Sequence, residues 1–512
     1  MLHMKAQSFI KGALIISVGG IAAKILGAFY RIPLTNFLGG EGMGVYQMVY
    51  PLYCLLLTVS ATGIPAGLAR AVSRAEAVGE SSSAVLRRAL GLFSLVGLCG
   101  SAWMFALAGP MSAAQGEPGA AMAYRVLAPS VLLVSVISCF RGWFQGRSNF
   151  YPTAVSELVE QAVKVGLGLF FAYTYRADVY TAVSYALLSV TCGELAACAF
   201  MLARAAGERG RRALYKDVRA MPSAASLLRI TVPVTVAAGI LPLSGVIDSV
   251  LITRLLSRYA ANATALYGLY SGAAAALANL PASVCYGLAA ASIPSVSANY
   301  AKGDAEAGQK GVLFAVKCTM FLAVPAAAFL LLFAPQICAF VFPSVTGAEG
   351  AVLARLVRIL APSSLLLAVV QTLSACLTGR GLAKYSALAM AAAVSVKLIL
   401  EAVLLQSAQI SVFGAAYATN ACYLVALLVD LYYSITERKL RARAFGYFSV
   451  FALAAVAAMA AAWPLRGVHI LLAAAAAGCA YLLIAAVAGF FGARELRFAW
   501  RKKHDYGRRT GL

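Results

Sequence analysis

Charged residues that stand inside long apolar stretches are the chemically distinctive feature of this sequence. A charge near the centre of a lipid bilayer costs about 2.5–3.5 kcal/mol, so such a residue is expected to face a water-filled cavity or an oppositely charged partner. These residues are Lys24, Glu157, Glu160, Lys164, Glu194, Asp248, Lys397 and Glu401. The lysines could together bind an anion, and the carboxylates could carry a proton or bind a cation.

Helical geometry places the three lysines at similar depths. Lys164 and Lys397 each lie thirteen residues after the expected start of a helix, near Tyr151 and Lys384. At 1.5 Å per residue this separation is about 20 Å, close to the centre of a bilayer. Lys24 lies equally deep in the first expected helix. We therefore expect all three lysines to line one cationic chamber and to contact an anionic substrate.

Local ion pairs are the alternative role for two of these lysines. Lys164 follows Glu160 by one helical turn, and Glu401 follows Lys397 in the same way, so each pair can form on a single helix. Lys24 has no acidic residue within one turn. It is therefore the stronger candidate for direct substrate contact.

Further charges each allow two roles. Arg31 lies about 30 Å beyond Lys11 along the same helix, at the expected outer interface, where it either contacts the substrate or extends to the lipid head groups. Asp248 is either an ion or proton site or the partner of Arg254, and Glu194 has no evident partner in the sequence. The carboxylates that we expect to bind an ion or to couple its movement are Glu157, Glu160, Glu194, Asp248 and Glu401.

A duplicated segment positions two of the lysines. Residues 125–164 and 358–397 align without a gap, and the alignment matches an Arg-x-Leu-Ala-Pro-Ser motif, a Gly-Arg dipeptide and the final lysine. One register for all three features indicates an internal duplication. Each copy is expected to form a helix, a Gly-Arg turn on the cytoplasmic side and a returning helix that carries the lysine.

Composition defines the class of protein that contains these elements. Of the 512 residues 62% are hydrophobic and 12% are charged, whereas soluble domains carry about 25% charged residues. The sequence therefore predicts an all-α polytopic membrane protein with about fourteen helices. These helices are expected near 9–35, 45–70, 88–110, 124–145, 152–175, 179–203, 227–255, 266–295, 312–335, 352–377, 384–406, 412–435, 446–463 and 468–491.

The duplication and the loops predict two six-helix halves with two additional helices. An even number of helices in each half implies a pseudo-two-fold axis along the membrane normal. The expected units are an N-terminal half at 1–204, a basic cytoplasmic linker at 205–226, a C-terminal half at 227–437, two additional helices at 438–493 and a basic cytoplasmic tail at 494–512.

Basic residues predict the orientation of the chain. The formal net charge is +23, and most lysines and arginines fall at one set of expected helix ends, which places both termini in the cytoplasm. The same charge favours contact with anionic membrane lipids or an anionic substrate. Because the charges are scattered over helix ends, nucleic-acid binding is not expected.

Other residue types exclude several kinds of chemistry. The eleven cysteines are dispersed through apolar runs and the three histidines lack metal-ligand spacing, so neither disulfides nor a metal site is expected. No phosphate-binding loop of the G-x-x-x-x-G-K-[ST] type occurs. We expect no cofactor, and we expect energy from the membrane potential or an ion gradient.

Glycine and proline residues interrupt expected helices at matching places in the two halves. Such interruptions predict moving elements around a central site, although both residues are common in membrane helices generally. The expected hinge residues are Gly27, Pro33, Pro65, Pro242 and Pro281.

The run KILGAFYRIPLTNFLGGEGMGVYQMVYPLYCLLLTVSATGIPAGLARAVS, residues 24–73, resembles the multidrug/oligosaccharidyl-lipid/polysaccharide exporter superfamily. The similarity is greatest to its polysaccharide-biosynthesis branch, with stage V sporulation protein B and lipid II flippases of the MurJ type. The resemblance implies a MATE-like fold and a monomeric flippase of the bacterial cytoplasmic membrane. Such a flippase moves an undecaprenyl-pyrophosphate-linked saccharide, with lipid II expected, outward by alternating access, in vegetative wall growth or in sporulation.

The same resemblance bears on individual residues and partners. By matched motif, Lys24 corresponds to the cationic residue that lipid II flippases carry in helix one. Those flippases also carry an arginine in helix two, where this chain has the neutral stretch LLLTVSATG. Cell-wall synthesis enzymes are the partners that the resemblance implies.

Two other functions remain as alternatives. A cation-coupled multidrug exporter of the same fold would favour acidic, aromatic-lined sites, and the interior lysines argue against it. A membrane glycosyltransferase or polymerase would need catalytic carboxylates at the membrane surface, but the expected external loops are short and carry only Glu41, Glu117, Asp178 and Glu349. We therefore expect a transporter rather than an enzyme.

Overall fold

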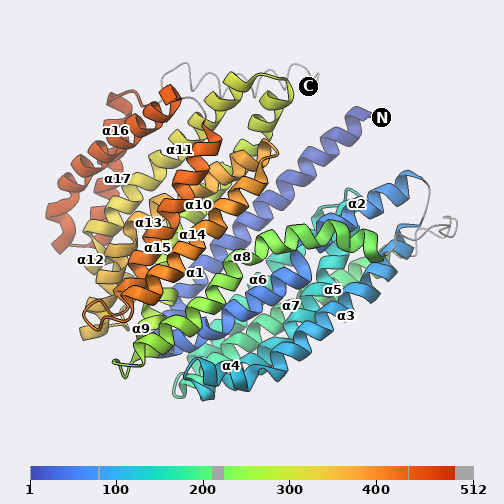
Figure 1. Ribbon diagram of the computed structural model, residues 1–512, viewed down its shortest axis with the longest axis horizontal. Coiled ribbons are helices and arrows are strands. Elements are labelled where there is room, and N and C mark those ends of the chain that lie inside the picture. The colour runs from blue at the N-terminus through green and yellow to red at the C-terminus, as the bar shows by residue number, and fades with distance from the viewer. Residues whose placement is uncertain (1, 79–80, 210–223, 436–437, 491–512) are drawn as a thin grey trace.

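Long helices lie side by side in two groups in the computed structural model (Figure 1). The structure describes residues 2–78, 81–209, 224–435 and 438–490, and for part of these ranges, residues 2–25 among them, it describes the backbone alone. No strand occurs within these ranges. Helices of residues 2–209 form one group, those of residues 224–487 form the other, and α1 and α8 lie where the two groups meet.

The first group contains the elements α1 to α7. Their bounds are α1 Leu2–Leu57, the π-helix η1 Thr58–Thr62, α2 Ile64–Ala77, α3 Ser82–Ala106, α4 Ala108–Ala114, the 3-10 helix η2 Pro118–Ala120, α5 Ala121–Gly146, α6 Tyr151–Thr174 and α7 Val179–Arg209. Within α1, Gly39 has φ 67°, and this conformation divides the element into two helices. Glycine adopts a positive φ without a steric penalty, so the break coincides with the residue that allows it.

The second group begins with α8, and α16 and α17 lie at its outer edge (Figure 1). The bounds are α8 Ala224–Leu256, α9 Ala263–Tyr267, the π-helix η3 Gly268–Ala274, α10 Ala275–Ala301, α11 Ala305–Leu332, α12 Ala334–Val341, α13 Gly347–Gly379, α14 Ala383–Leu404, α15 Phe413–Ser434, α16 Arg438–Ala462, η4 Trp463–Gly467 and α17 Ile470–Val487. α16 packs on α11 and on α17.

Eleven segments among the described residues are long and apolar enough to cross a membrane. The all-α polytopic class is therefore confirmed, but the expected number of fourteen is not. The first two expected helices contribute one continuous segment, Phe29–Ala77. α6 is not among the eleven, and it carries Glu157, Glu160 and Lys164 in its interior.

Boundaries between the expected units are only partly visible. α7 continues to Arg209, beyond the expected end of the N-terminal half at residue 204, and α8 begins at Ala224. Most of the linker expected at 205–226 and all of the tail expected at 494–512 lie outside the described residues. The division into units and the symmetry axis stay predictions.

Both copies of the duplicated segment form a helix, a turn and a second helix. They are α5 with α6 and α13 with α14. The matched serines make the same bond, because Ser130 Oγ donates to the Leu127 carbonyl and Ser363 Oγ donates to the Leu360 carbonyl at 2.6 Å. The copies therefore share local structure as well as sequence.

The arginine of each Gly-Arg turn joins neighbouring helices. Arg147 stacks over Trp143 at 4.5 Å and forms ion pairs with Glu76 of α2, at 3.2 Å, and with Glu208 of α7. Its counterpart Arg380 stacks over Tyr300 of α10 and donates to the last carbonyls of α15. In each group a single guanidinium thus holds the ends of three helices together.

Glycines form a tight contact between the two groups beside the break at Gly39. A Cβ atom at Gly44 would overlap the carbonyl of Thr264, and one at Gly268 would overlap the backbone of Gly40. A Cβ atom at Gly272 would likewise meet the Met43 side chain. We call these four residues, Gly40, Gly44, Gly268 and Gly272, the glycine contact. It brings the backbones of α1 and η3 closer than any larger residue allows.

Hydrogen bonds between the groups cluster near the glycine contact. Gln47 Nε2 donates to the Ser271 carbonyl at 2.7 Å, and Thr264 Oγ1 donates to the Glu117 carboxylate. Further bonds join Tyr267 to Gln47, Gln115 to Ser249, Arg254 to Ala114, and Asn36 to Val341 and Ser344. The two groups are therefore held together at this end of the molecule.

Candidate functional site

A cavity of about 540 Å³ lies between the two groups of helices. We call it the first cavity. It is lined from α1 by Gly27, Tyr30, Arg31, Tyr46 and Tyr50, from α5 by Arg141, from α6 by Glu157, Glu160, Gln161 and Lys164, and from α10 by Ala276, Asn279 and Ser283. Its size falls in the range of small-molecule sites.

Lys164 enters this cavity from α6 and is 8% exposed. Its Nζ atom donates to Tyr50 Oη at 3.3 Å and lies 5.3 Å from the centre of the Tyr50 ring and 5.8 Å from that of Tyr30. Among the described residues it forms no ion pair with a carboxylate. Aromatic faces attract an ammonium group but leave its formal charge uncompensated.

Arg31 lines the same cavity from α1 and is half-buried. It too forms no ion pair with any carboxylate in the part of the chain that the structure describes. The sequence left two roles open, substrate contact or extension to lipid head groups. The position of Arg31 at the cavity favours the first, because it places two uncompensated cations at one cavity.

Glu160 has a different partner from the lysine one turn away. It forms an ion pair with Arg141 of α5 at 2.9 Å, and Arg141 Nε also donates to Ser156 Oγ at 3.0 Å. The pair between Glu160 and Lys164 that helical spacing allowed is therefore not formed. Arg141 was not among the expected site residues, because its position near the Gly-Arg turn suggested a helix-end charge.

Glu194 is buried on α7 and accepts a hydrogen bond from Tyr53 Oη at 3.1 Å. Its partner comes from α1, far away in the sequence, which explains why the sequence showed none. Glu194 does not line the first cavity. Glu157 does line it, from the same helix as Lys164.

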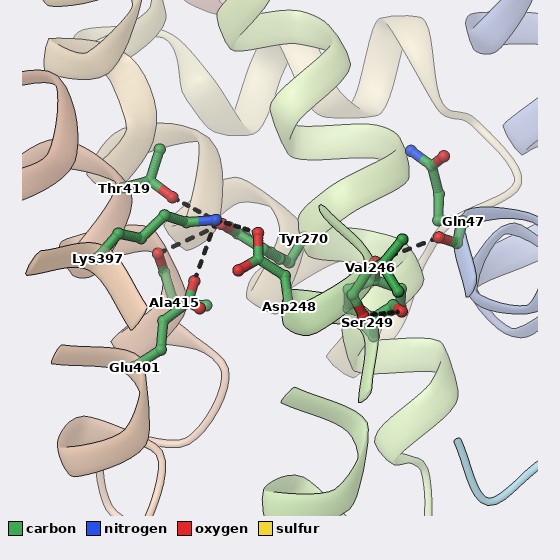
Figure 2. A network of polar contacts seen from close by, with 10 residues as sticks. Gln47, Val246, Asp248, Ser249, Tyr270, Lys397, Glu401, Ala415 and Thr419 are labelled. Carbon is green, nitrogen blue, oxygen red and sulfur yellow. Dashed lines mark hydrogen bonds and ion pairs between the residues drawn. The ribbon is translucent and has the colours of Figure 1, made fainter. Parts of the chain in front are cut away.

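A second cavity, of about 220 Å³, lies among α8, α10, α13, α14 and α15. Lys397 of α14 extends into it toward Asp248 of α8, with Glu401 beside the same point (Figure 2). Lys397 Nζ forms ion pairs with Asp248 Oδ2 and, at 3.4 Å, with Glu401 Oε1. The charge of this lysine is therefore compensated by two carboxylates.

Hydroxyl groups surround this ion pair. Tyr270 Oη lies 2.7 Å from Thr419 Oγ1, and both residues line the second cavity (Figure 2). Asp248 is 8% exposed, and its Oδ1 atom has no hydrogen-bond partner among the described residues. The alternative pair of Asp248 with Arg254 is wrong, because Arg254 Nε donates to the Ala114 carbonyl at 2.7 Å.

The two cavities meet at Asn279 of α10, which lines both. Lys164 and Lys397 therefore belong to adjoining cavities rather than to the single chamber that equal depth suggested. The side chain of Lys24 lies outside the described residues, so its contacts stay a prediction.

The expected hinge residues lie at several different sites. Gly27 lines the first cavity, Pro65 follows the π-helix η1 at the start of α2, and Pro33 lies within α1. Pro242 and Pro281 lie within α8 and α10. Their role as hinges stays a prediction.

Three tyrosines of α1 form a periodic aromatic pattern that is visible in the sequence. Tyr46, Tyr50 and Tyr53 follow the helical spacing of α1, and their rings contact one another in sequence, with 5.4 Å between the centres of Tyr46 and Tyr50. Tyr30, Arg141 and Asn279 had no comparable signal, because only the packing of separate helices brings them to the site.

Comparisons with known proteins point to one group of membrane transporters. The family model described as "Polysaccharide biosynthesis protein" matches residues 9–299. Stage V sporulation protein B of Bacillus subtilis (strain 168) is 27% identical over 310 residues, which cover 57% of this chain and 59% of that protein. Lipid II flippase MurJ of the same organism is 28% identical over 172 residues, 31% of each chain. The chain thus matches less than two thirds of the length of either relative.

Two solved structures share the fold. The structure titled "Lipid II flippase MurJ, inward closed conformation" has a TM-score of 0.71 and 14% identity, and the match covers 93% of this chain and 99% of that one. An inward-facing multidrug resistance MATE family transporter of the MOP superfamily has a TM-score of 0.69 and 17% identity, with 83% and 95% covered. At these identities the likeness establishes the MATE-like fold alone.

Proposed function

This chain belongs to the polysaccharide biosynthesis protein family, and from that premise we propose that it is a flippase for an undecaprenyl-pyrophosphate-linked saccharide, with lipid II as the expected substrate. The family match and the fold both support a membrane transporter rather than an enzyme. The substrate is inferred from the chemistry of the first cavity.

The uncompensated cations Arg31 and Lys164 are the observation that carries this proposal. Both line the first cavity, and neither forms an ion pair with a described carboxylate. Cations within membrane helices are costly unless an anion or water meets them. A pyrophosphate supplies several negative oxygens, and charge-assisted hydrogen bonds to guanidinium and ammonium groups are the strong kind.

The neighbouring ion pairs define which cations remain free for the substrate. Glu160 compensates Arg141, and Asp248 and Glu401 compensate Lys397. We therefore propose Arg31 and Lys164 as the primary anion ligands, while a ligand role of Lys397 stays a prediction. Lys24 retains that role as a prediction.

Alternating access requires the contact between the two groups of helices to open and close. In this structure the glycine contact and the adjacent hydrogen bonds hold one end together. We propose that this end faces the outside, because the N-terminal end of α1, which the basic residues predict to be cytoplasmic, lies at the opposite end of the molecule (Figure 1). The polyprenyl tail would stay in the lipid while the head group crosses through the cavity.

Energy for outward movement would come from the membrane potential or an ion gradient. The potential is worth about 2.3 kcal/mol for each charge moved through 100 mV. We place the protein in the bacterial cytoplasmic membrane as a monomer surrounded by membrane lipids, in contact with cell-wall synthesis enzymes that supply or use the lipid-linked saccharide.

A cation-coupled multidrug exporter is the second candidate, favoured by the fold likeness to a MATE transporter and by the acidic, tyrosine-lined second cavity. Reconstitution into vesicles distinguishes the two functions. The flippase should move a fluorescent lipid II to the opposite leaflet. Absence of this movement, together with transport of a cationic drug, would reject the proposed function in favour of the exporter.

A further inference from the structure

We propose that the second cavity is the subsite for the uncharged saccharide part of the substrate, while the first cavity holds the pyrophosphate. This inference rests on the function proposed above. It adds that the two parts of the substrate head group bind in different cavities.

The first step of the argument is the charge of each cavity. Arg31 and Lys164 bring uncompensated positive charge to the first cavity. In the second, Asp248 and Glu401 compensate the charge of Lys397, so this group carries no net positive charge. An anion is therefore attracted more strongly to the first cavity than to the second. A ligand with an anionic part and a neutral polar part is therefore oriented by this difference.

The second step is the chemistry of the lining. The second cavity presents the hydroxyl-bearing residues Ser244, Ser271, Ser363, Thr419, Tyr267 and Tyr423. Hydroxyl groups both donate and accept hydrogen bonds, as the hydroxyls of a sugar do. Tyrosine adds an apolar ring that can cover the C–H face of a sugar. At about 220 Å³ the cavity is smaller than a site for a whole drug-sized molecule, so it suits one part of a larger ligand.

The third step is an acceptor that lacks a partner. Asp248 lines the second cavity and is 92% buried, because only 8% of its surface is exposed. Lys397 holds its Oδ2 atom, whereas Oδ1 has no hydrogen-bond partner in the described part of the chain. Buried polar atoms are rarely left unpaired in folded proteins. A sugar hydroxyl is a neutral donor that would satisfy Oδ1 without adding charge.

The fourth step is the connection between the cavities. Asn279 lines both, and its amide makes no hydrogen bond to another described side chain or backbone group. The amide offers both a donor and an acceptor. It therefore lies where the bond between pyrophosphate and saccharide would pass from one cavity into the other.

The experiment compares two probes bound to the purified full-length protein. One is a polyprenyl pyrophosphate, and the other is the same lipid with a linked disaccharide. The wild-type protein should bind the disaccharide lipid more tightly. Asn279→Ala and Tyr423→Phe, two changes that remove polar groups without creating a buried charge, should each reduce that preference. Asp248→Asn should reduce it by about tenfold, as expected for a hydrogen bond to a charged group.

Arg31→Ala is the matched control for the other cavity. It should weaken binding of both probes and should not selectively weaken binding of the disaccharide lipid. The inference is overturned if the second-cavity variants, folded as judged by thermal unfolding, weaken both probes equally or leave the preference intact. If the wild-type protein instead binds neither probe better than phosphatidylglycerol, the proposed function itself fails.

Discussion

Arg141 of α5 forms an ion pair with Glu160 of α6 at 2.9 Å, and this pair takes away the carboxylate nearest in sequence to Lys164. The lysine is left with the hydroxyl and ring of Tyr50 as its neighbours. Its counterpart in the duplicated segment, Lys397, has two carboxylates instead. Two lysines at equivalent sequence positions therefore have different electrostatic environments, and they should respond differently to substitution.

Loss of Lys397 should affect stability more than loss of Lys164. Lys397→Met leaves Asp248 and Glu401 buried without a cation, and breaking a buried ion pair in this way costs about 3–5 kcal/mol. Lys164→Met removes a charge that no described carboxylate compensates, so its effect should fall on transport. Thermal unfolding in detergent should show a large decrease in the melting temperature of the Lys397 variant and a small decrease in that of the Lys164 variant. Equal decreases would contradict the distinction.

Coupling between Lys397 and Asp248 should be measurable in a double-mutant cycle. Lys397→Met combined with Asp248→Asn removes both partners of the closest ion pair and leaves one carboxylate, Glu401, without a cation. Lys397→Met alone leaves two carboxylates, Asp248 and Glu401, without one. The double variant should therefore lose less stability than the two single changes together, with a coupling of about 1–3 kcal/mol. Additive losses of stability would show that the ion pair in Figure 2 does not stabilise the folded protein.

Substitution in the glycine contact should disturb the closed end of the molecule. A Cβ atom at Gly268 would overlap backbone atoms of Gly40 and Gly44, which cannot move aside like a flexible side chain. Gly268→Ala should therefore separate α1 from η3 and slow transport. A cysteine placed at Ser271 reports the change, because thiol reagents added from that end should reach it faster in the Gly268→Ala protein.

Gly446→Ala is the control for that experiment, since an added Cβ atom on α16 meets no other atom within 4 Å. It should leave both transport and thiol access unchanged. Unaltered thiol access in the Gly268→Ala protein would show that the glycine contact does not close this end.

The arginines of the two Gly-Arg turns should be important for stability rather than for substrate binding. Arg147 joins Glu76 and Glu208, while Arg380 reaches backbone carbonyls at the end of α15. Arg147→Ala should destabilise the protein by about 1.5–3 kcal/mol, because it removes the charged hydrogen bonds that join α2 and α7 to the turn. The affinity of the folded variant for a polyprenyl pyrophosphate should stay the same. A selective loss of affinity would assign Arg147 to the binding site instead.

Sequence reasoning succeeded where the relevant interaction is local. The i,i+4 spacing of Lys397 and Glu401 predicted a pair that the structure contains, and the shared motif predicted two equivalent helix pairs. Helical geometry could also have excluded the pair of Asp248 with Arg254. Residues six apart on a helix point about 120° apart around its axis, so they do not share a face.

The other contacts of the site depend on packing between helices that are far apart in the sequence. Glu160 has a lysine one turn away, but the α5–α6 pairing brings Arg141 to it first. Asn279 reaches the boundary of the two cavities only because α10 packs against α1. Tertiary contacts of this kind leave no periodic pattern in the sequence, so neither residue could be identified before the helices were placed.

The rate of lipid II translocation by proteoliposomes tests the central claim most directly. Arg31→Gln combined with Lys164→Gln removes both uncompensated cations of the first cavity, whereas Lys164→Arg keeps the charge and serves as the control. The double variant should lose at least about 99% of the wild-type rate, which corresponds to about 2.7 kcal/mol, and Lys164→Arg should keep most of it. Wild-type translocation by a folded double variant would contradict the assignment of these two residues to the pyrophosphate.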